Sequence, residues 1–137
     1  MIRMISFSAL ILAGAAAAGC SDDNAPPTTP IETPVQISES FQGSINLNGA
    51  ATHTFATERA GQATATLTTL SPDSAAIVSF VFGTWNGQYC QAILFKDDAT
   101  TGANLIGNAS LGSFCVRVAD VGRLTAPTNY SITVQHY

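Results

Sequence analysis

Charged residues are scarce in this chain, and basic residues are the scarcest of them. Asp, Glu, Lys and Arg make up 10% of the 137 residues, with five Lys and Arg against nine Asp and Glu and a formal net charge of −4. Nucleic acids and anionic lipid headgroups attract proteins through clusters of basic side chains. The composition therefore argues against nucleic acid as a partner and against electrostatic binding to an anionic membrane surface.

The motifs of common catalytic sites are also missing. The chain has two histidines, and it contains no GxSxG, HExxH, glycine-rich phosphate loop or EF-hand loop. His53 shares a strand face with Phe55, which favours a packed or edge histidine, and His136 lies beside the last residue. We predict that the protein is not an enzyme and has a binding or structural role. The alternative is a small hydrolase, or an accessory domain of an exported enzyme, with a site that no motif reveals.

No apolar segment is long enough to span a membrane as a helix. Residues 5–18 carry no charge and follow the basic Arg3, but this segment is shorter than the roughly 18 residues that a transmembrane helix needs. A basic start, an apolar centre and small residues at the end are features of a secretory signal peptide. We expect residues 1–19 to be removed during export.

Cys20 follows this signal within Ala17-Ala18-Gly19-Cys20. These residues resemble the lipobox of bacterial lipoproteins. The resemblance implies cleavage before Cys20 and acylation of that cysteine, with palmitate among the expected acyl chains, so that lipid holds the protein on a membrane. Two or more acyl chains make such an anchor stable, at about 0.8 kcal/mol per buried methylene. Ser21 stands where inner-membrane lipoproteins of enteric bacteria have Asp, which favours the outer membrane. The alternative is an ordinary signal peptide with an incidental cysteine.

The remaining cysteines form a pair. The chain has three cysteines, and an odd number leaves an unpaired thiol in an oxidising compartment unless one is used otherwise. With Cys20 acylated, Cys90 and Cys115 are left, and in an exported protein we predict a disulfide between them. A metal-binding pair is the alternative, but no CxxC motif or histidine cluster accompanies these residues.

A proline-rich segment separates the signal from the rest of the chain. Residues 21–35 read "SDDNAPPTTPIETPV", with four prolines and few residues that a core would bury. Such a composition predicts a disordered tether. At about 3.1 Å per residue, an extended tether reaches roughly 45 Å. We therefore expect a lipidated cysteine and tether over residues 20–35 and one folded domain over residues 36–137.

This domain has the pattern of an all-β protein. Several segments alternate apolar and polar residues, "AIVSFVFGTW" is nearly all apolar as a central strand is, and no segment has a sustained helical stripe with caps. We predict an antiparallel β-sandwich or jelly roll of about eight strands. The expected strands span residues 35–41, 44–47, 51–57, 62–70, 76–85, 89–95, 103–109, 113–120 and 129–135.

Two Asn-Gly pairs predict tight turns between these strands. Asn48-Gly49 lies between residues 44–47 and 51–57, and Asn86-Gly87 lies between residues 76–85 and 89–95. Asn and Gly accept the positive φ angles of two-residue hairpin turns. We predict a β-hairpin at each pair.

Two segments resemble a known domain family. "THTFATERAGQATATLTTL" (52–70) resembles the opening of the bacterial pre-peptidase C-terminal (PPC) domain, and "SFCVRVADVGRLTAPTNYSITVQHY" (113–137) resembles its closing strands. The resemblance covers residues 41–137. It implies a small jelly-roll domain of the kind appended to exported enzymes, some of which bind substrate polymers or calcium.

Three aromatic residues are candidates for contact with a protein or polysaccharide partner. Trp85, Tyr89 and Tyr137 fit the alternating core pattern least well, and exposed aromatic side chains stack on sugars or anchor protein partners. The alternative is that these side chains cap the sandwich core.

One acidic pair is a candidate for a cation. Asp97 and Asp98 are adjacent in "FKDDATTGANLIGN", where carboxylate, amide and carbonyl oxygens are the ligands that Ca²⁺ prefers. The alternative is a solvated turn. No other cofactor is expected.

Overall fold

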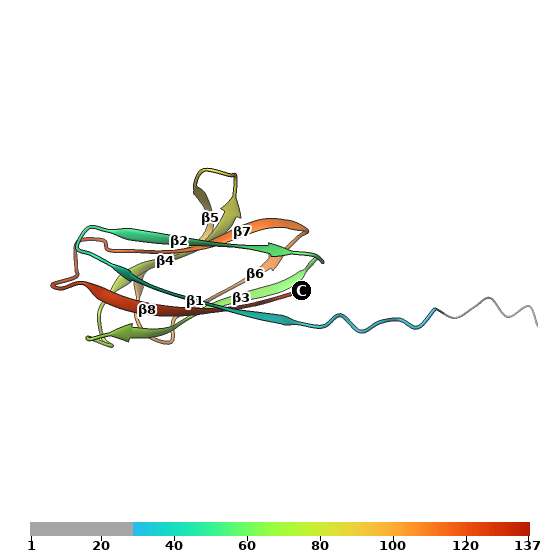
Figure 1. Ribbon diagram of the computed structural model, residues 1–137, viewed down its shortest axis with the longest axis horizontal. Helices are drawn as coiled ribbons and strands as arrows, with labels where there is room; N and C mark the ends of the chain where they lie inside the picture. Colours follow the sequence, from blue (N-terminus) through green and yellow to red (C-terminus); the bar gives the residue numbers. More distant parts are fainter. Residues whose placement is uncertain (1–28) are drawn as a thin grey trace, which may run out of the picture. The chain divides into compact units, whose positions relative to one another are not determined.

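The computed structural model describes residues 29–137, and Figure 1 shows the arrangement of their strands. Cys20, the predicted signal peptide and the first part of the predicted tether lie outside the described residues. Residues 29–36 have no regular secondary structure, and the first strand begins at Ile37. Residues 33–137 belong to one compact unit. Within the described part of the chain, no helix is long and apolar enough to cross a membrane.

Eight antiparallel strands form two sheets of four. The order in the first sheet is β1-β8-β3-β6, and the order in the second sheet is β2-β7-β4-β5. This is the strand order of a jelly roll, so the predicted all-β sandwich is confirmed. The strands are β1 (Ile37–Ile45), β2 (Ala50–Thr57), β3 (Gly61–Ser71), β4 (Val78–Trp85), β5 (Cys90–Ala99), β6 (Asn104–Ala109), β7 (Gly112–Ala119) and β8 (Thr128–His136).

The alternation in the sequence decides which side chains fill the core. In β8, every second residue from Thr128 to His136 is buried, and the residues between them are exposed or half-buried. Three aromatic rings contributed by the second sheet, those of Phe55, Phe82 and Phe114, meet with centroids 5.7 to 6.0 Å apart. A buried side chain of this kind contributes about 1.5 to 3 kcal/mol of hydrophobic stabilisation. The core therefore lies between the sheets, as expected for a sandwich.

β4 is the central strand that its apolar sequence predicts. It pairs with β7 on one side and β5 on the other, and its residues from Val78 to Gly83 are all buried. Phe80 and Phe82 are in the core, whereas Val81 is 7% exposed and is not in the core cluster. A strand covered in this way tolerates apolar residues on both faces.

The hairpin predicted at Asn48-Gly49 is wrong. The turn is tight, with a φ of 57° at Asn48 and a hydrogen bond from Gly49 N to Asn46 O of 2.8 Å, but β1 and β2 belong to different sheets. The inner faces of both strands line the same core, so the chain turns across the sandwich. In addition, the strands expected at 35–41 and 44–47 are one strand, β1, which passes through Gly43 because β8 pairs with it continuously.

Candidate functional site

The β4–β5 hairpin is the one connection between consecutive strands that stays within a sheet. We call residues 84–95 the finger. Its tip rises from the sandwich in Figure 1, and its last residues lie in the sheet, where Phe95 pairs with Val81. The hairpin predicted at Asn86-Gly87 is confirmed, but its loop has four residues, from Asn86 to Tyr89. Asn86 Oδ1 accepts hydrogen bonds of 2.9 Å from the backbone N–H groups of Gln88 and Tyr89, and Gly87 has a φ of 95°. Asn86 and Gly87 thus shape the tip of the finger.

Gly83 allows the backbone of β5 to pass close to β4 at the base of the finger. The pairing of β4 with β5 is irregular between Phe82 and Gly83. A Cβ atom at Gly83 would collide with the carbonyl oxygen of Gln91 and lie 3.1 Å from the Cα atom of Ala92. Because the backbone of β5 passes this close, position 83 has no space for a side chain, and glycine is the residue that permits the close approach of the two strands.

The predicted disulfide joins the finger to the neighbouring strand. Cys90 begins β5, and Cys115 lies on β7 directly opposite Gly83. Their Cα atoms are 5.7 Å apart, within the range for a disulfide. Cys115 points away from the core residues Phe114 and Val116 yet is 0% exposed. The bond therefore lies on the outer side of the sheet, as predicted, and ties the finger to β7.

The finger exposes a group of large apolar side chains. Tyr89 is 58% exposed, Ile93 52% and Phe95 64%, and Trp85 is half-buried outside the core cluster. The chain has no Asp, Glu, Lys or Arg between Asp73 and Lys96. An uncharged, aromatic surface on a projecting element is typical of a protein-binding site. Of the predicted aromatic candidates, Trp85 and Tyr89 come together here, and the core-capping alternative does not apply to Tyr89.

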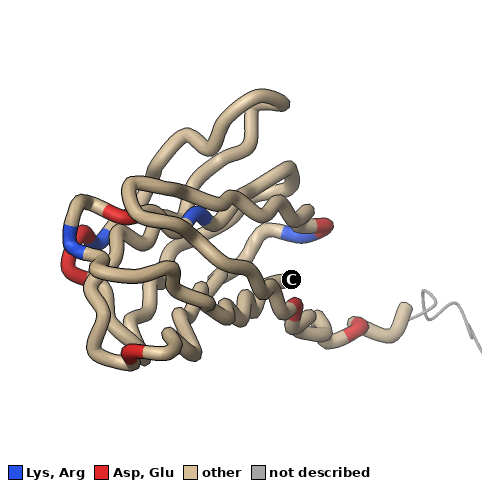
Figure 2. The backbone as a smooth tube through the Cα atoms, turned by 60° about the vertical axis from the view of Figure 1, so that its left-hand side comes forward, with Lys and Arg blue, Asp and Glu red and all other residues tan. Residues whose placement is uncertain are grey.

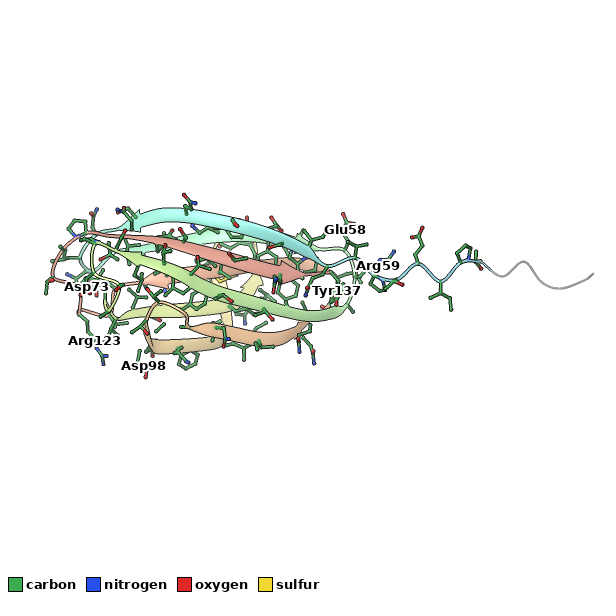
Figure 3. The ribbon with its side chains drawn as sticks, turned by 90° about the horizontal axis from the view of Figure 1, so that it is seen from below. Glu58, Arg59, Asp73, Asp98, Arg123 and Tyr137 are labelled. Carbon is green, nitrogen blue, oxygen red and sulfur yellow. A yellow bond between two sulfur atoms is a disulfide. The ribbon has the colours of Figure 1, made fainter. Side chains whose placement is uncertain are left out.

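Tyr137 lies apart from the finger. It follows β8, in the other sheet, and its carbonyl oxygen accepts a hydrogen bond of 3.4 Å from the backbone N–H of Arg59. Figure 3 shows both residues at the same end of the sandwich. The Tyr137 ring packs on Gly61 beside a shallow hollow of about 270 Å³ that Thr33 and Pro34 also line. Tyr137 is therefore no part of a common site with Trp85 and Tyr89.

The acidic pair lies near the end of β5. Ser79 Oγ donates a hydrogen bond of 2.7 Å to Asp97 Oδ1, and Asp98 is exposed to solvent (Figure 3). Among residues 29–137, no three His, Cys, Asp or Glu side chains gather as a metal site requires. A calcium ion at Asp97 and Asp98 stays a prediction that rests on two carboxylates.

The two histidines are packed beside β1. His53 stacks on Phe41, with ring centroids 5.1 Å apart, and its Nε2 atom lies 2.7 Å from the hydroxyl oxygen of Tyr130. Burial lowers the pKa of His53 and raises that of Tyr130. His136 is 1% exposed, and its Nε2 atom lies 2.7 Å from Glu39 Oε1. The predicted packed position of His53 is confirmed, but the burial of His136 was not expected from its place beside the last residue.

Within residues 29–137, the hydrogen-bond partners of the two histidines include no serine, threonine or cysteine side chain. The hydrogen-bond partner of His53 is a tyrosine hydroxyl, and that of His136 is a carboxylate. The thiols of Cys90 and Cys115 are both in the disulfide. A nucleophile within hydrogen-bond reach of a base is the usual sign of nucleophilic catalysis. Tyr130 lies within that reach of His53, but burial raises the pKa of its hydroxyl, which disfavours the nucleophilic form.

Asp120 is a polar residue whose role the sequence analysis missed. Its carboxylate accepts hydrogen bonds of 2.8 to 3.1 Å from the backbone N–H groups of Asn48, Gly122, Arg123 and Leu124. These bonds, that of Asn48 first, lower the pKa of Asp120. Asp120 therefore joins the β1–β2 loop to the β7–β8 loop. The "Asp-Val-Gly" sequence, which is typical of a side-chain-capped turn, is the signal that was available.

The exposure of Ile93 and Phe95 was also not predicted from the sequence. The sequence "YCQAILF" reads as an ordinary strand with a buried face. The available signal was that Ile93, Leu94 and Phe95 are consecutive apolar residues, so a two-faced edge strand must expose some of them. Leu94 faces the core cluster, and its two neighbours are exposed.

No protein-family model matches the chain, and no curated protein matches it. Among solved structures, the fold is similar to the crystal structure of PliG from Aeromonas hydrophila, a periplasmic lysozyme inhibitor of g-type lysozyme. The TM-score is 0.51 and the sequence identity 17%, over 71% of this chain and 83% of PliG. At this identity the likeness shows a common fold. The resemblance to the PPC domain stays a prediction.

Proposed function

We propose that this chain is a lipid-anchored, non-catalytic protein of the bacterial cell envelope that binds a protein partner through the finger. The observation that carries the proposal is the finger itself. Tyr89, Ile93 and Phe95 are more than half exposed on a hairpin that a disulfide holds away from the core. Exposing such side chains to water is unfavourable, and burying them against a partner removes that cost.

The protein of similar fold supports a binding role. PliG is named for the inhibition of a g-type lysozyme, which is a role in binding another protein, and for a periplasmic location. The signal peptide and the lipobox-like Cys20 support a location in the envelope on independent grounds, with the outer membrane favoured by Ser21.

The finger is tested by crosslinking in intact cells. A photoreactive amino acid replaces Tyr89 in one variant and Thr52 in a control variant, because Thr52 is an exposed residue of the same sheet on the opposite edge strand, β2. We expect a protein adduct from position 89 and none from position 52. Equal adducts from positions 89 and 52, or no adduct from position 89, would refute the finger as the binding site.

A g-type lysozyme is the first candidate partner to test. The rate of cell-wall lysis is measured with the purified protein and with the Tyr89→Ala/Phe95→Ala variant. If the partner is such an enzyme, the protein inhibits lysis and the variant loses most of the inhibition. Hydrolysis of the cell wall by the protein alone would favour the enzyme alternative instead.

The anchor is tested by mass. Protein extracted from membranes is expected to lack residues 1–19 and to have acyl groups on Cys20, and Cys20→Ser is expected to move the protein to the soluble fraction. Recovery of unmodified protein from the soluble fraction, with Cys20→Ser behaving in the same way, would refute lipidation.

A further inference from the structure

The outer face of the first sheet consists almost entirely of uncharged polar side chains. In each of its four strands, alternate residues point away from the core. Apart from Ile106, the outward residues are Ser38, Ser40, Gln42, Ser44, Gln62, Thr64, Thr66, Thr68, Thr69, Ser71, Asn104, Asn108, Asn129, Ser131, Thr133 and Gln135. We call this surface the amide–hydroxyl face.

Formal charge is absent from the amide–hydroxyl face. Glu39 is the only Asp, Glu, Lys or Arg in β1, β8, β3 and β6, and it contacts the buried His136. Figure 2 shows long stretches of strand without charged residues, and Figure 3 shows Asp73 and Arg123 at one end of this sheet and Glu58 at the other. Exposed strand faces ordinarily include Lys, Glu, Arg and Asp. Solubility alone does not require their complete exclusion.

The pairing of the strands arranges most of these side chains in four rows across the sheet. Neighbouring members of a row lie about 4.8 Å apart, and successive rows lie about 6.8 Å apart along the strands. The face is thus a regular array of hydrogen-bonding groups. The rows are Ser38–Gln135–Thr64–Ile106, Ser40–Thr133–Thr66–Asn104, Gln42–Ser131–Thr69 and Ser44–Asn129–Ser71.

A bulge gives the array a shallow hollow. The pairing of β3 with β8 shifts between Leu67 and Thr69, which places the two consecutive threonines Thr68 and Thr69 on the exposed side. Thr68 Oγ1 donates a hydrogen bond of 3.0 Å to the carbonyl oxygen of Ser131. Beside the bulge, a depression of about 370 Å³ lies in the face, lined by Gln42, Gly43, Thr69, Ser71, Asn129, Tyr130 and Ser131.

We propose that the amide–hydroxyl face binds a neutral glycan, that is, a chain of uncharged sugars lying across the rows with one sugar in the depression. Every hydroxyl and amide side chain of the face both donates and accepts hydrogen bonds, as each sugar hydroxyl does. A polyanion requires basic side chains, and a protein interface requires an apolar, aromatic centre. The face has no basic or aromatic side chain, and Ile106, on the edge strand β6, is its one large apolar side chain, so its chemistry matches a polyhydroxyl chain.

The binding test uses three uncharged hexasaccharides as probes: β-1,4-linked N-acetylglucosamine, β-1,4-linked glucose and β-1,4-linked mannose. Each is added to ¹⁵N-labelled protein at about 10 mM, a concentration that populates even a millimolar complex. Hexagalacturonate is the charged control. We expect at least one neutral probe to shift amide resonances of β1, β8 and β3 in a saturable way, and hexagalacturonate to shift none of them.

A pair of double variants locates the site. Gln42→Ala/Asn129→Ala removes two exposed side chains from the depression, and we expect binding to weaken about tenfold for the loss of two hydrogen bonds. The matched control Thr52→Ala/Thr54→Ala, on exposed positions of β2 in the other sheet, is expected to leave affinity within about twofold of the original. Urea unfolding of both variants checks that they fold.

Several results would overturn the proposal. These are the absence of shifts with all three neutral probes, equal binding of hexagalacturonate, shifts confined to the finger, or an equal loss of affinity in the control variant. A photoreactive residue at Thr66 that captures a protein in cells would reassign the face to a protein partner. The finger variant Tyr89→Ala/Phe95→Ala is expected to bind the glycan normally, so this proposal and the proposed function fail independently.

Discussion

Replacement of both cysteines by alanine, in Cys90→Ala/Cys115→Ala, tests whether the disulfide stabilises the fold by restricting the unfolded chain. The two residues are 25 positions apart. For a loop of this length the chain-entropy relation predicts a contribution of about 3.5 kcal/mol to the free energy of unfolding. Cys115 is 0% exposed, so its replacement also removes packed atoms.

Reduction of the unmodified protein separates these two effects. The reduced protein keeps both cysteine side chains, as thiols, and loses the covalent bond that restricts the unfolded chain. We expect urea unfolding to show a loss of about 2 to 4 kcal/mol on reduction. The double variant is expected to lose about 1 kcal/mol more, from the smaller side chain at position 115.

The position of the bond also predicts a local effect. Beyond Gly83, the ladder between β4 and β5 is short, running from the Gly83–Ala92 pair to the Trp85–Cys90 pair. Reduction is therefore expected to speed hydrogen exchange in residues 86–91, while β8 stays protected. A loss of less than about 1 kcal/mol on reduction, or an equal increase of exchange throughout both sheets, would refute this reasoning.

Three further substitutions test the site and the core. Gly83→Ala is expected to lower the free energy of unfolding by about 1 to 3 kcal/mol, because the new Cβ meets the backbone of Gln91. Phe82→Ala, at a side chain that is 1% exposed, is expected to cost about 3 to 5 kcal/mol by the same urea assay. His53 has a lowered pKa because of its burial, so the unfolded chain binds this proton more strongly. Stability is therefore expected to be highest above about pH 6.5 and to fall as the pH drops toward the lowered pKa, with a smaller fall in His53→Gln.

These predictions have separate controls. Gly87→Ala also alters a glycine of this hairpin, but a Cβ there meets no atom within 4 Å, so its cost comes from the φ of 95° alone. If Gly83→Ala lowers the free energy of unfolding no more than Gly87→Ala does, the close approach of the Gln91 backbone to Gly83 is contradicted. A pH profile that is identical in His53→Gln and the original protein would show that His53 does not contribute to the acid sensitivity.

Alternation of side chains was enough to predict the sandwich. In β3 and β8 the apolar residues recur at every second position, and the structure buries them. It was not enough to predict which strands pair, because a strand facing a core has the same pattern whichever neighbour it has. Asn48-Gly49 illustrates this, since the positive φ of Asn48 serves a turn between two sheets as well as a hairpin.

The candidate site was predictable only in part. Trp85 and Tyr89 adjoin the Asn86-Gly87 turn in the sequence, so their proximity follows from the hairpin. The exclusion of Tyr137 follows from the position of β8 in the other sheet, which is a property of the whole topology. The direction of the finger depends on the absence of a Cβ atom at Gly83 and on the disulfide at Cys115. No local sequence pattern shows which backbone lies against Gly83 or which residue bonds to Cys115.

The strand order has a consequence for the way the chain folds. Of the six strand pairings, only β4 with β5 joins consecutive strands, and β1 pairs with β8, the last strand. Pairings between distant segments slow folding, and all-β domains of this kind take milliseconds to seconds. A growing chain that ends before Gly112 lacks both β7 and β8, each of which pairs with two other strands. Neither sheet is complete at that stage, so we expect this domain to fold only after β7 and β8 have been synthesised.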